Sequence, residues 1–298
     1  IIILKLAHLI NPAEFPSNSA LQFAQKVTFK CIVRAANEAK EVKLELLTTQ
    51  FEEDEKVVPL HFRKLSNLRL HTGAINSDLS KRKLPFLKEI LNKAKALREA
   101  DYLIYSNIDI ALMPYFYQEV QRQLESGHDA LVINRRRISD TYSSLSELPA
   151  MYADIGYSHP GFDCFIFKRE LIDQFELGNI CVGVPFSGVS LLHNVLAFSN
   201  NPKVIMDKHL TFHLGTDVLN FRRDEYYWHN RKEYFEKVKP KLQPYLELKK
   251  FPYADLPRFK RSVKWMLNPS LATKDLVRFE LKNFKQRLKN WRWDILQS

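Results

Sequence analysis

The sequence predicts a layered α/β domain with a mostly parallel central sheet, followed by a basic helical C-terminal extension. Apolar runs of strand length alternate with stretches of helical periodicity over most of the chain, a pattern typical of parallel sheets covered by helices. The excess positive charge lies at the end: residues 231–298 contain 18 Lys and Arg against 7 Asp and Glu, whereas residues 1–230 contain 27 of each kind. We therefore expect two domains, 1–225 and 226–298.

The cysteine content and hydropathy indicate the cellular compartment of the protein. Cys31, Cys164 and Cys181 show neither close pairing nor the spacing of a metal knuckle, which is typical of a reducing compartment. No apolar run reaches about 18 residues, so we expect no transmembrane helix. The opening residues lack the basic-then-apolar order of a signal peptide. We expect a cytoplasmic protein, with peripheral contact at the inner face of the membrane as an open alternative.

The first elements follow a βαβ order. Alternating or continuous apolar runs mark the strands, a Ser cap and an apolar stripe mark the first helix, and a proline marks the start of the second. The expected elements are a strand at 1–10, a helix from Ser19 to about Lys40, a strand at Val42–Thr49, a short strand at Leu68–Ile75, a helix at Pro85–Arg98 and a buried strand at 101–110.

The remaining elements of the α/β part are shorter and their turns are richer in polar residues. Residues 138–157 are polar and are expected to form a loop with a short helix that covers a site. The other expected elements up to residue 175 are a helix at Pro114–Ser126, a strand at Asp129–Asn134, a glycine-bearing turn that leads into a strand within 156–169, and a helical turn at Glu170–Phe175. They are followed by a loop and short strand over Gly178–Gly183 and Pro185–Gly188, a helix at Ser190–Ser199, a short strand at 204–207 and a strand at His209–Gly215.

The C-terminal extension has a different character. Charged and aromatic residues dominate, and Pro252, Pro257 and Pro269 divide the chain into short pieces. The last helix, about 273–296, carries one narrow apolar seam among basic residues. Docking of that seam on the body or on a second copy, and contact with an anionic membrane surface, both fit this pattern. Nucleic acid is not expected as a partner, because no recognisable nucleic-acid module is present.

The end of the strand at 101–110 is the first candidate site. Its apolar run is interrupted by Ser106, Asn107, Ile108 and Asp109. In open α/β sheets, ligands bind just beyond the carboxyl ends of the strands, so Asn107 and Asp109 stand where chemistry is expected. Asn and Asp are also ordinary turn residues, and the sequence alone supports both interpretations.

Cationic side chains flank the same region in the expected topology. Arg135 begins a run of three arginines at the end of a strand, and arginine forks suit phosphate oxygens. Lys81 and Arg82 precede a helix N-terminus, where free amides favour an anion. A solvated basic turn is the competing interpretation for each group.

His213 and Asp163 complete the candidates. His209 and His213 are four residues apart, about 13 Å on a strand, so they cannot share one metal ion. His213, at the strand end, is the better-placed ligand. Asp163 stands between the apolar Phe162 and Cys164, where a carboxylate is costly unless it is paired or used. A structural Asp that accepts from turn amides is the alternative.

These features, in this order, resemble the GT-A class of nucleotide-diphospho-sugar transferases, a Rossmann-like fold, over roughly residues 1–220. The cues are the N-terminal βαβ half, the Lys/Arg segment before a helix, the strand with an acidic end, the segment Gly161–Phe167 and a late His. In that class the strand-end motif is Asp-any-Asp, which holds a divalent metal on the donor diphosphate. Here the motif is Asn107-Ile108-Asp109, with Asn107 in place of the first carboxylate.

The resemblance implies a glycosyltransferase that moves a sugar from a nucleotide-diphosphate donor to a hydroxyl of a glycan, lipid-linked or other acceptor, with Mn²⁺ or Mg²⁺ as cofactor. It assigns roles to seven residues: Asp109 and His213 to the metal, Lys81, Arg82, Asn107 and Arg135 to the donor and its phosphates, and Asp163 to the catalytic base of an inverting reaction.

Two other functions stay open at this level. Asn107 in the metal motif is consistent with a GT-A-like module that binds a nucleotide sugar without catalysis. The basic C-terminal helix is consistent with a protein that acts on a membrane surface or a polyanion through residues 273–296.

Overall fold

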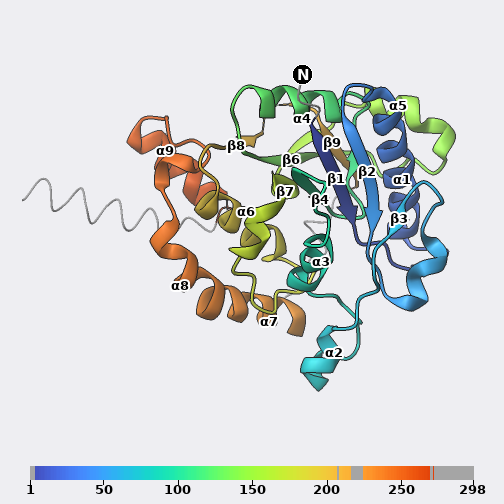
Figure 1. Cartoon of the computed structure of the whole chain (residues 1–298), viewed down its shortest axis with the longest axis horizontal. Coiled ribbons are helices and arrows are strands. Elements are labelled where there is room, and N and C mark those ends of the chain that lie inside the picture. The colour runs from blue at the N-terminus through green and yellow to red at the C-terminus, as the bar shows by residue number, and fades with distance from the viewer. Residues whose placement is uncertain (1–3, 207, 216–223, 269–270, 272–298) are drawn as a thin grey trace, which may run out of the picture.

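The computed structural model describes residues 4–206, 208–215, 224–268 and 271 (Figure 1). These residues form a mixed α/β fold around a sheet with the strand order β3-β2-β1-β4-β7-β6-β9-β5, and β8 pairs with β6. Five of the eight strand pairings in the described part are parallel, which confirms the predicted mostly parallel sheet. The strands are β1 (Lys5–Ile10), β2 (Lys43–Thr48), β3 (Arg63–Lys64), β4 (Tyr102–Ser106), β5 (Ala111–Leu112), β6 (Ala130–Ile138), β7 (Tyr157–Lys168), β8 (Pro202–Ile205) and β9 (Thr211–Leu214).

The helices cover both faces of the sheet, as the alternation of side chains along β1 requires. Leu6 and Ile10 pack in the cluster that contains α1 and α4, whereas Ala7 and Leu9 pack in the cluster that contains α3 and α6. The helices are α1 (Ala20–Glu38), α2 (Thr72–Ile75), α3 (Leu87–Ala94), α4 (Phe116–Glu125), α5 (Leu148–Ala153), α6 (Ser187–Phe198), α7 (Glu225–Glu233), α8 (Lys239–Leu242) and α9 (Arg258–Leu267).

The order of the strands creates a switch point between β1 and β4. From β1 the chain passes through α1 to β2 on one side, and it later returns through α3 to β4 on the other side of β1. The connections through α1 and α3 lie on opposite faces of the sheet, and α/β sheets bind their ligands at the carboxyl ends of strands where the strand order reverses in this way. The segment Asn107–Asp109 follows β4 directly and therefore lies at this switch point.

The strands β6 and β7 differ from their predicted lengths. β7 runs over the whole of Tyr157–Lys168, including the expected turn, and it is antiparallel to both β4 and β6. The run of three arginines lies inside β6 and not after it, because Arg136 and Arg137 pair with β7 on one side and with β9 on the other. The prediction of a strand end at Asn134 is therefore wrong; the register with β7 shifts there instead.

Two short elements were also wrongly predicted. Leu68–Ile75 is not a strand; it holds the helical turn α2, on a lobe that projects beyond the sheet in Figure 1. The hydrogen bonds that a third strand would make to β2 come from Arg63–Lys64. The segment Pro185–Gly188 contains no strand, and its last two residues begin α6.

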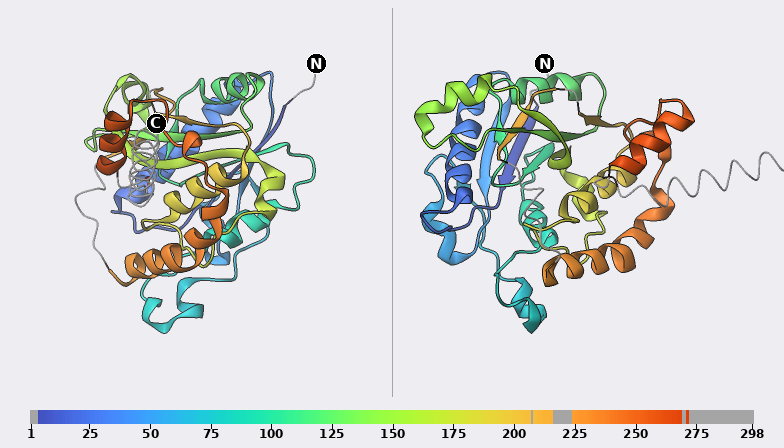
Figure 2. Two further views of the ribbon diagram at one scale, coloured as in Figure 1. Left: turned by 90° about the vertical axis from the view of Figure 1, so that its left-hand side faces the viewer. Right: turned by 180° about the vertical axis from the view of Figure 1, so that it is seen from behind.

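The described part of the C-terminal extension is helical, as predicted, and it is built into the body. α7, α8 and α9 follow one another along the side of the molecule opposite α1 (Figures 1 and 2). Tyr226 and Trp265 are 1% exposed, and Trp265 belongs to the cluster on the α3 and α6 face. The expected helix 273–296 lies outside the described residues. Within the part that the structure describes, no helix is long and apolar enough to cross a membrane.

Candidate functional site

The carboxyl end of β4 makes a tight turn that directs two polar side chains to the sheet edge. The Asn107 N–H donates to the Asp163 carbonyl at 3.1 Å, and the Ile110 N–H donates back to the Asn107 carbonyl at 3.1 Å. The chain then enters β5, which pairs with β9. The turn interpretation of this segment is thus correct for the backbone, and the turn is what presents Asn107 and Asp109.

Asp109 and His213 lie together at this edge. The pairing of Ala111 with Phe212 sets β9 beside the turn, and His213 Nε2 lies 3.1 Å from Asp109 Oδ2. The His213 side chain is 3% exposed and that of Asp109 is 16% exposed. A carboxylate and an imidazole are thus held in direct contact at the edge, and the prediction that these two residues share a site is consistent with this geometry.

Asn107, Asp163 and Arg135 form a second cluster across β4, β7 and β6. The Asn107 amide donates to Asp163 Oδ1 at 2.9 Å, and Arg135 Nη1 lies 3.2 Å from Asp163 Oδ2. The side chains of Arg135 and Asp163 are 9% and 16% exposed. Both oxygens of the Asp163 carboxylate are therefore engaged, one by a neutral amide and one by a guanidinium.

Lys81 and Arg82 are held elsewhere. Arg82 Nη2 lies 2.5 Å from Asp224 Oδ2, and its guanidinium stacks 4.2 Å from the centre of the Tyr226 ring. Lys81 Nζ lies 3.3 Å from Glu225 Oε1. These two cations thus link the lobe before α3 to the start of α7, and their contacts are not with the cluster around Asp109.

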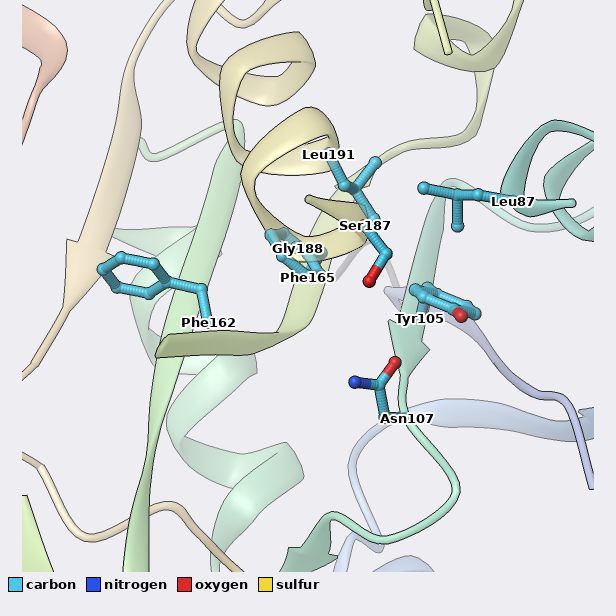
Figure 3. A pocket seen from close by; sticks show the side chains of 8 residues that line it. All are labelled: Leu87, Tyr105, Asn107, Phe162, Phe165, Ser187, Gly188 and Leu191. Atoms are coloured by element: carbon cyan, nitrogen blue, oxygen red, sulfur yellow. The ribbon is translucent and has the colours of Figure 1, made fainter. Parts of the chain in front are cut away.

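A narrow hollow lies next to Asn107, between the start of α6 and the end of β4 (Figure 3). The Ser187 hydroxyl and the Asn107 carboxamide point toward it, whereas the other walls are mostly apolar. It is too narrow to hold even a water molecule, whereas ligand pockets enclose roughly 300–1,000 Å³. A nucleotide sugar would therefore have to bind outside it unless its walls move apart. The lining residues are Leu87, Tyr105, Asn107, Phe162, Phe165, Ser187, Gly188 and Leu191.

The close contact between α6 and β7 depends on Gly188. A Cβ built at this position would lie 2.5 Å from the carbonyl oxygen of Phe162, so only glycine permits the contact. Phe186, just before α6, has φ 73°, a left-handed conformation that is rare for a bulky residue. The sequence prediction missed this close contact because it assigned Gly188 to a loop or short strand and not to a helix.

A buried polar group beneath the turn was also missed. His8 on β1 is 1% exposed; its ring lies 2.9 Å from Ser106 Oγ and 2.6 Å from the Tyr117 hydroxyl. Burial lowers the pKa of His8 to about 3, so the ring is neutral at physiological pH. The signal available in the sequence was a single histidine inside an apolar strand. Through these two contacts, His8 links Ser106, the last residue of β4, to Tyr117 in α4.

Asp109 and His213 would offer a cation one oxygen and one nitrogen, which is fewer ligands than a complete protein site provides. In the described ranges, no group of three or more His, Cys, Asp or Glu side chains could hold a metal ion. Burial, reinforced by Asp163 and Asp109, raises the pKa of Tyr105, so that phenol stays protonated. Burial likewise raises the pKa of Cys164, which makes it a poor nucleophile.

No protein-family model and no curated protein matches the chain. Among solved structures, S. aureus TarS 1–349 in complex with UDP-GlcNAc matches with 10% identity and a TM-score of 0.46, over 87% of this chain and 70% of that one. A longer S. aureus TarS structure matches with 8% identity and a TM-score of 0.46, over 90% of this chain and 43% of that one. The 4-diphosphocytidyl-2C-methyl-D-erythritol synthase of Anaerococcus prevotii matches with 10% identity and a TM-score of 0.39, over 76% and 95%. No activity follows from likenesses this distant.

Proposed function

We propose that the protein is a GT-A-like glycosyltransferase that moves a sugar from a nucleotide-diphosphate donor to an acceptor hydroxyl, with a divalent cation at Asp109 and His213. The observation that carries the proposal is the 3.1 Å contact between Asp109 Oδ2 and His213 Nε2 at the carboxyl end of β4. The carboxyl ends of β1 and β4, at the switch in strand order, are where an α/β sheet of this topology binds its ligand.

The residues present fit a cation that is shared with the substrate. Mg²⁺ and Mn²⁺ sites on phosphate substrates use one or two protein ligands, and phosphate oxygens and water complete the shell. Asp109 supplies an anionic oxygen and His213 an imidazole nitrogen, which Mn²⁺ accepts better than Mg²⁺ does. When bound, such a cation neutralises charge on the leaving diphosphate. We therefore expect metal and nucleotide to strengthen each other's binding.

The second cluster positions the groups around the donor. Arg135 and Asn107 both contact Asp163, so one carboxylate fixes an amide and a guanidinium at the edge of the site. In the proposed arrangement, Arg135 and Asn107 face the donor. Lys81 and Arg82 would have to exchange their contacts with Glu225 and Asp224 to reach a phosphate.

Asp163 remains our candidate base for an inverting reaction. In that step the acceptor oxygen attacks the anomeric carbon, its proton moves to Asp163, and the nucleoside diphosphate leaves with the bonding electron pair. Taking the proton would weaken the contact between Asp163 and Arg135. An Asp163→Asn variant tests this role: a base predicts that the rate no longer rises with pH as the carboxylate ionises, whereas a purely positioning carboxylate leaves the pH profile in place.

The test of the proposal is donor hydrolysis with Mn²⁺ across UDP- and GDP-sugars, starting with UDP-GlcNAc. We expect turnover that Asp109→Ala abolishes. Asp101→Ala is the matched control, because Asp101 lies at the opposite end of β4, where it accepts from the Lys5 N–H at 3.0 Å. Absence of both binding and turnover with every donor would overturn the proposal.

A non-catalytic module is the second candidate, and Asn107 favours it. An amide at this position leaves one carboxylate in the turn for the cation. Calorimetry distinguishes the two functions: a module binds UDP-sugar and Mn²⁺ with no hydrolysis at any donor or acceptor concentration. The acceptor class and a membrane role of residues 273–296 remain predictions.

A further inference from the structure

The helix α9 (Arg258–Leu267) is fixed to the body by one face. Trp265 is 1% exposed, and its indole N–H donates to the Pro252 carbonyl at 2.7 Å. Arg261 Nη1 donates to the Ala254 carbonyl at 2.9 Å. These contacts determine which side of the helix faces outward.

The outward face is apolar. Phe259 is 80% exposed, Met266 62% and Leu267 75%. They lie seven and eight positions apart along the helix, which places all three on the same side of it. Large side chains gathered in this way on an outer helix mark an interaction surface more often than scattered ones do.

The charges on α9 are all of one sign. The helix contains Arg258, Lys260, Arg261 and Lys264 and no Asp or Glu, and Lys260 and Lys264 are exposed. The apolar strip is thus flanked by cations. This is the pattern of a helix that lies in the interface of an anionic bilayer, with apolar side chains at the acyl boundary and lysines at the headgroups.

We propose that the outward face of α9 binds the surface of an anionic lipid bilayer. A second copy of this face would bring the same positive charge. Residues 272–298 of the chain would also repel it, because they contain 7 Lys and Arg against 3 Asp and Glu. A nucleic acid would pair with the lysines but offers no hydrocarbon for Phe259, Met266 and Leu267. This inference does not depend on the proposed sugar transfer.

The direct test places an environment-sensitive fluorophore on the full chain at Met266→Cys. Labelling is selective because Cys31, Cys164 and Cys181 are all buried. We expect a blue shift, and quenching by nitroxide-labelled lipid, with phosphatidylcholine vesicles that contain phosphatidylglycerol, and neither with phosphatidylcholine alone. Leu60→Cys is the control, because Leu60 is fully exposed in the connection between β2 and β3. An unshifted spectrum from the label at position 266 with anionic vesicles would overturn the proposal.

Vesicle flotation measures the contribution of each group. Replacing Phe259, Met266 and Leu267 by Ser, or reversing charge with Lys260→Glu and Lys264→Glu, is expected to weaken binding at least about tenfold. Lys30→Glu with Lys40→Glu changes the net charge equally at exposed positions of α1 and the turn after it, and should have a much smaller effect. Equal binding by all variants contradicts the proposal. So does tighter binding to single-stranded DNA than to vesicles, or a dimer that the serine variant dissociates.

Discussion

The two clusters at the sheet edge differ in how their carboxylates are satisfied. Asp163 is held from both sides, by Asn107 at 2.9 Å and Arg135 at 3.2 Å, so its charge is compensated within the protein. Asp109 instead contacts the imidazole of His213 at 3.1 Å, and a neutral imidazole is a common metal ligand. From this comparison we expect the Asp163 cluster to stabilise the fold around the site and the Asp109–His213 pair to provide the proposed cation ligands.

Removing the Asp109 carboxylate, the proposed cation ligand, has the largest expected effect. Asp109→Ala should lower donor turnover by about 1,000-fold, since a bound cation contributes several kcal/mol of charge stabilisation. Its unfolding free energy should stay close to that of the wild type. The measurements are steady-state hydrolysis and urea unfolding. A loss of stability as large as that of Arg135→Met, in the Asp163 cluster, would contradict the different roles proposed for the two clusters.

Breaking the Asp163 cluster should instead cost stability. Arg135→Met leaves the mostly buried Asp163 without its cation and is expected to lower the unfolding free energy by about 3 kcal/mol. Adding Asp163→Asn removes the uncompensated charge and should restore part of the loss. Urea unfolding of the four proteins of this double-mutant cycle measures the coupling, and additive losses would show that the pair contributes nothing.

The buried His193 offers a contrast to His213. Burial lowers the pKa of His193 to about 4, and its ring contacts the Tyr234 hydroxyl at 2.6 Å and the Leu271 carbonyl at 2.9 Å. Because its folded pKa lies below the ordinary 6.5, stability should fall as pH drops from about 6.5 toward 4. The loss is about 2 kcal/mol by pH 5. Thermal or urea unfolding at pH 7 and 5 checks this; His193→Gln should be less stable at pH 7 but lose less between the two values.

Asn107→Asp has the smallest expected effect, and it tests whether residue 107 belongs with Asp163 or with the proposed cation. It places a second carboxylate against Asp163 Oδ1, so without metal we expect a loss of about 1 kcal/mol at pH 7.5. Repulsion raises a carboxyl pKa, so the loss should shrink as pH falls. Mn²⁺ should stabilise this variant more than it stabilises the wild type. Differential scanning fluorimetry with and without Mn²⁺ measures this, and equal metal shifts would mean that residue 107 does not face the cation.

The sequence was sufficient to predict the fold class, and it pointed to the sheet edge where the structure brings Asp109 and His213 together. Strand periodicity identified β4, and the rule for carboxyl ends directed attention to Asn107 and Asp109. The sequence could not show that β7 is antiparallel, because a buried strand has the same apolar pattern whether it runs parallel or antiparallel to its neighbours. The contact of Asp163 with Arg135 depends on that direction.

Contacts between residues distant in sequence explain the other differences. Lys81 and Arg82 were expected at a phosphate, but their partners Glu225 and Asp224 lie more than 140 positions away. The contact of Gly188 with the Phe162 carbonyl, likewise, is a property of packing between α6 and β7. No local periodicity encodes such contacts.

The most direct test of the central claim is Mn²⁺ binding measured by the electron paramagnetic resonance signal of the free ion. We predict that UDP and the wild-type protein together deplete the free signal by more than the sum of their separate depletions, and that Asp109→Ala and His213→Ala each abolish this cooperation. Equal depletion by the wild type and both variants, or depletion that does not depend on UDP, would contradict a metal site shared by Asp109, His213 and the donor.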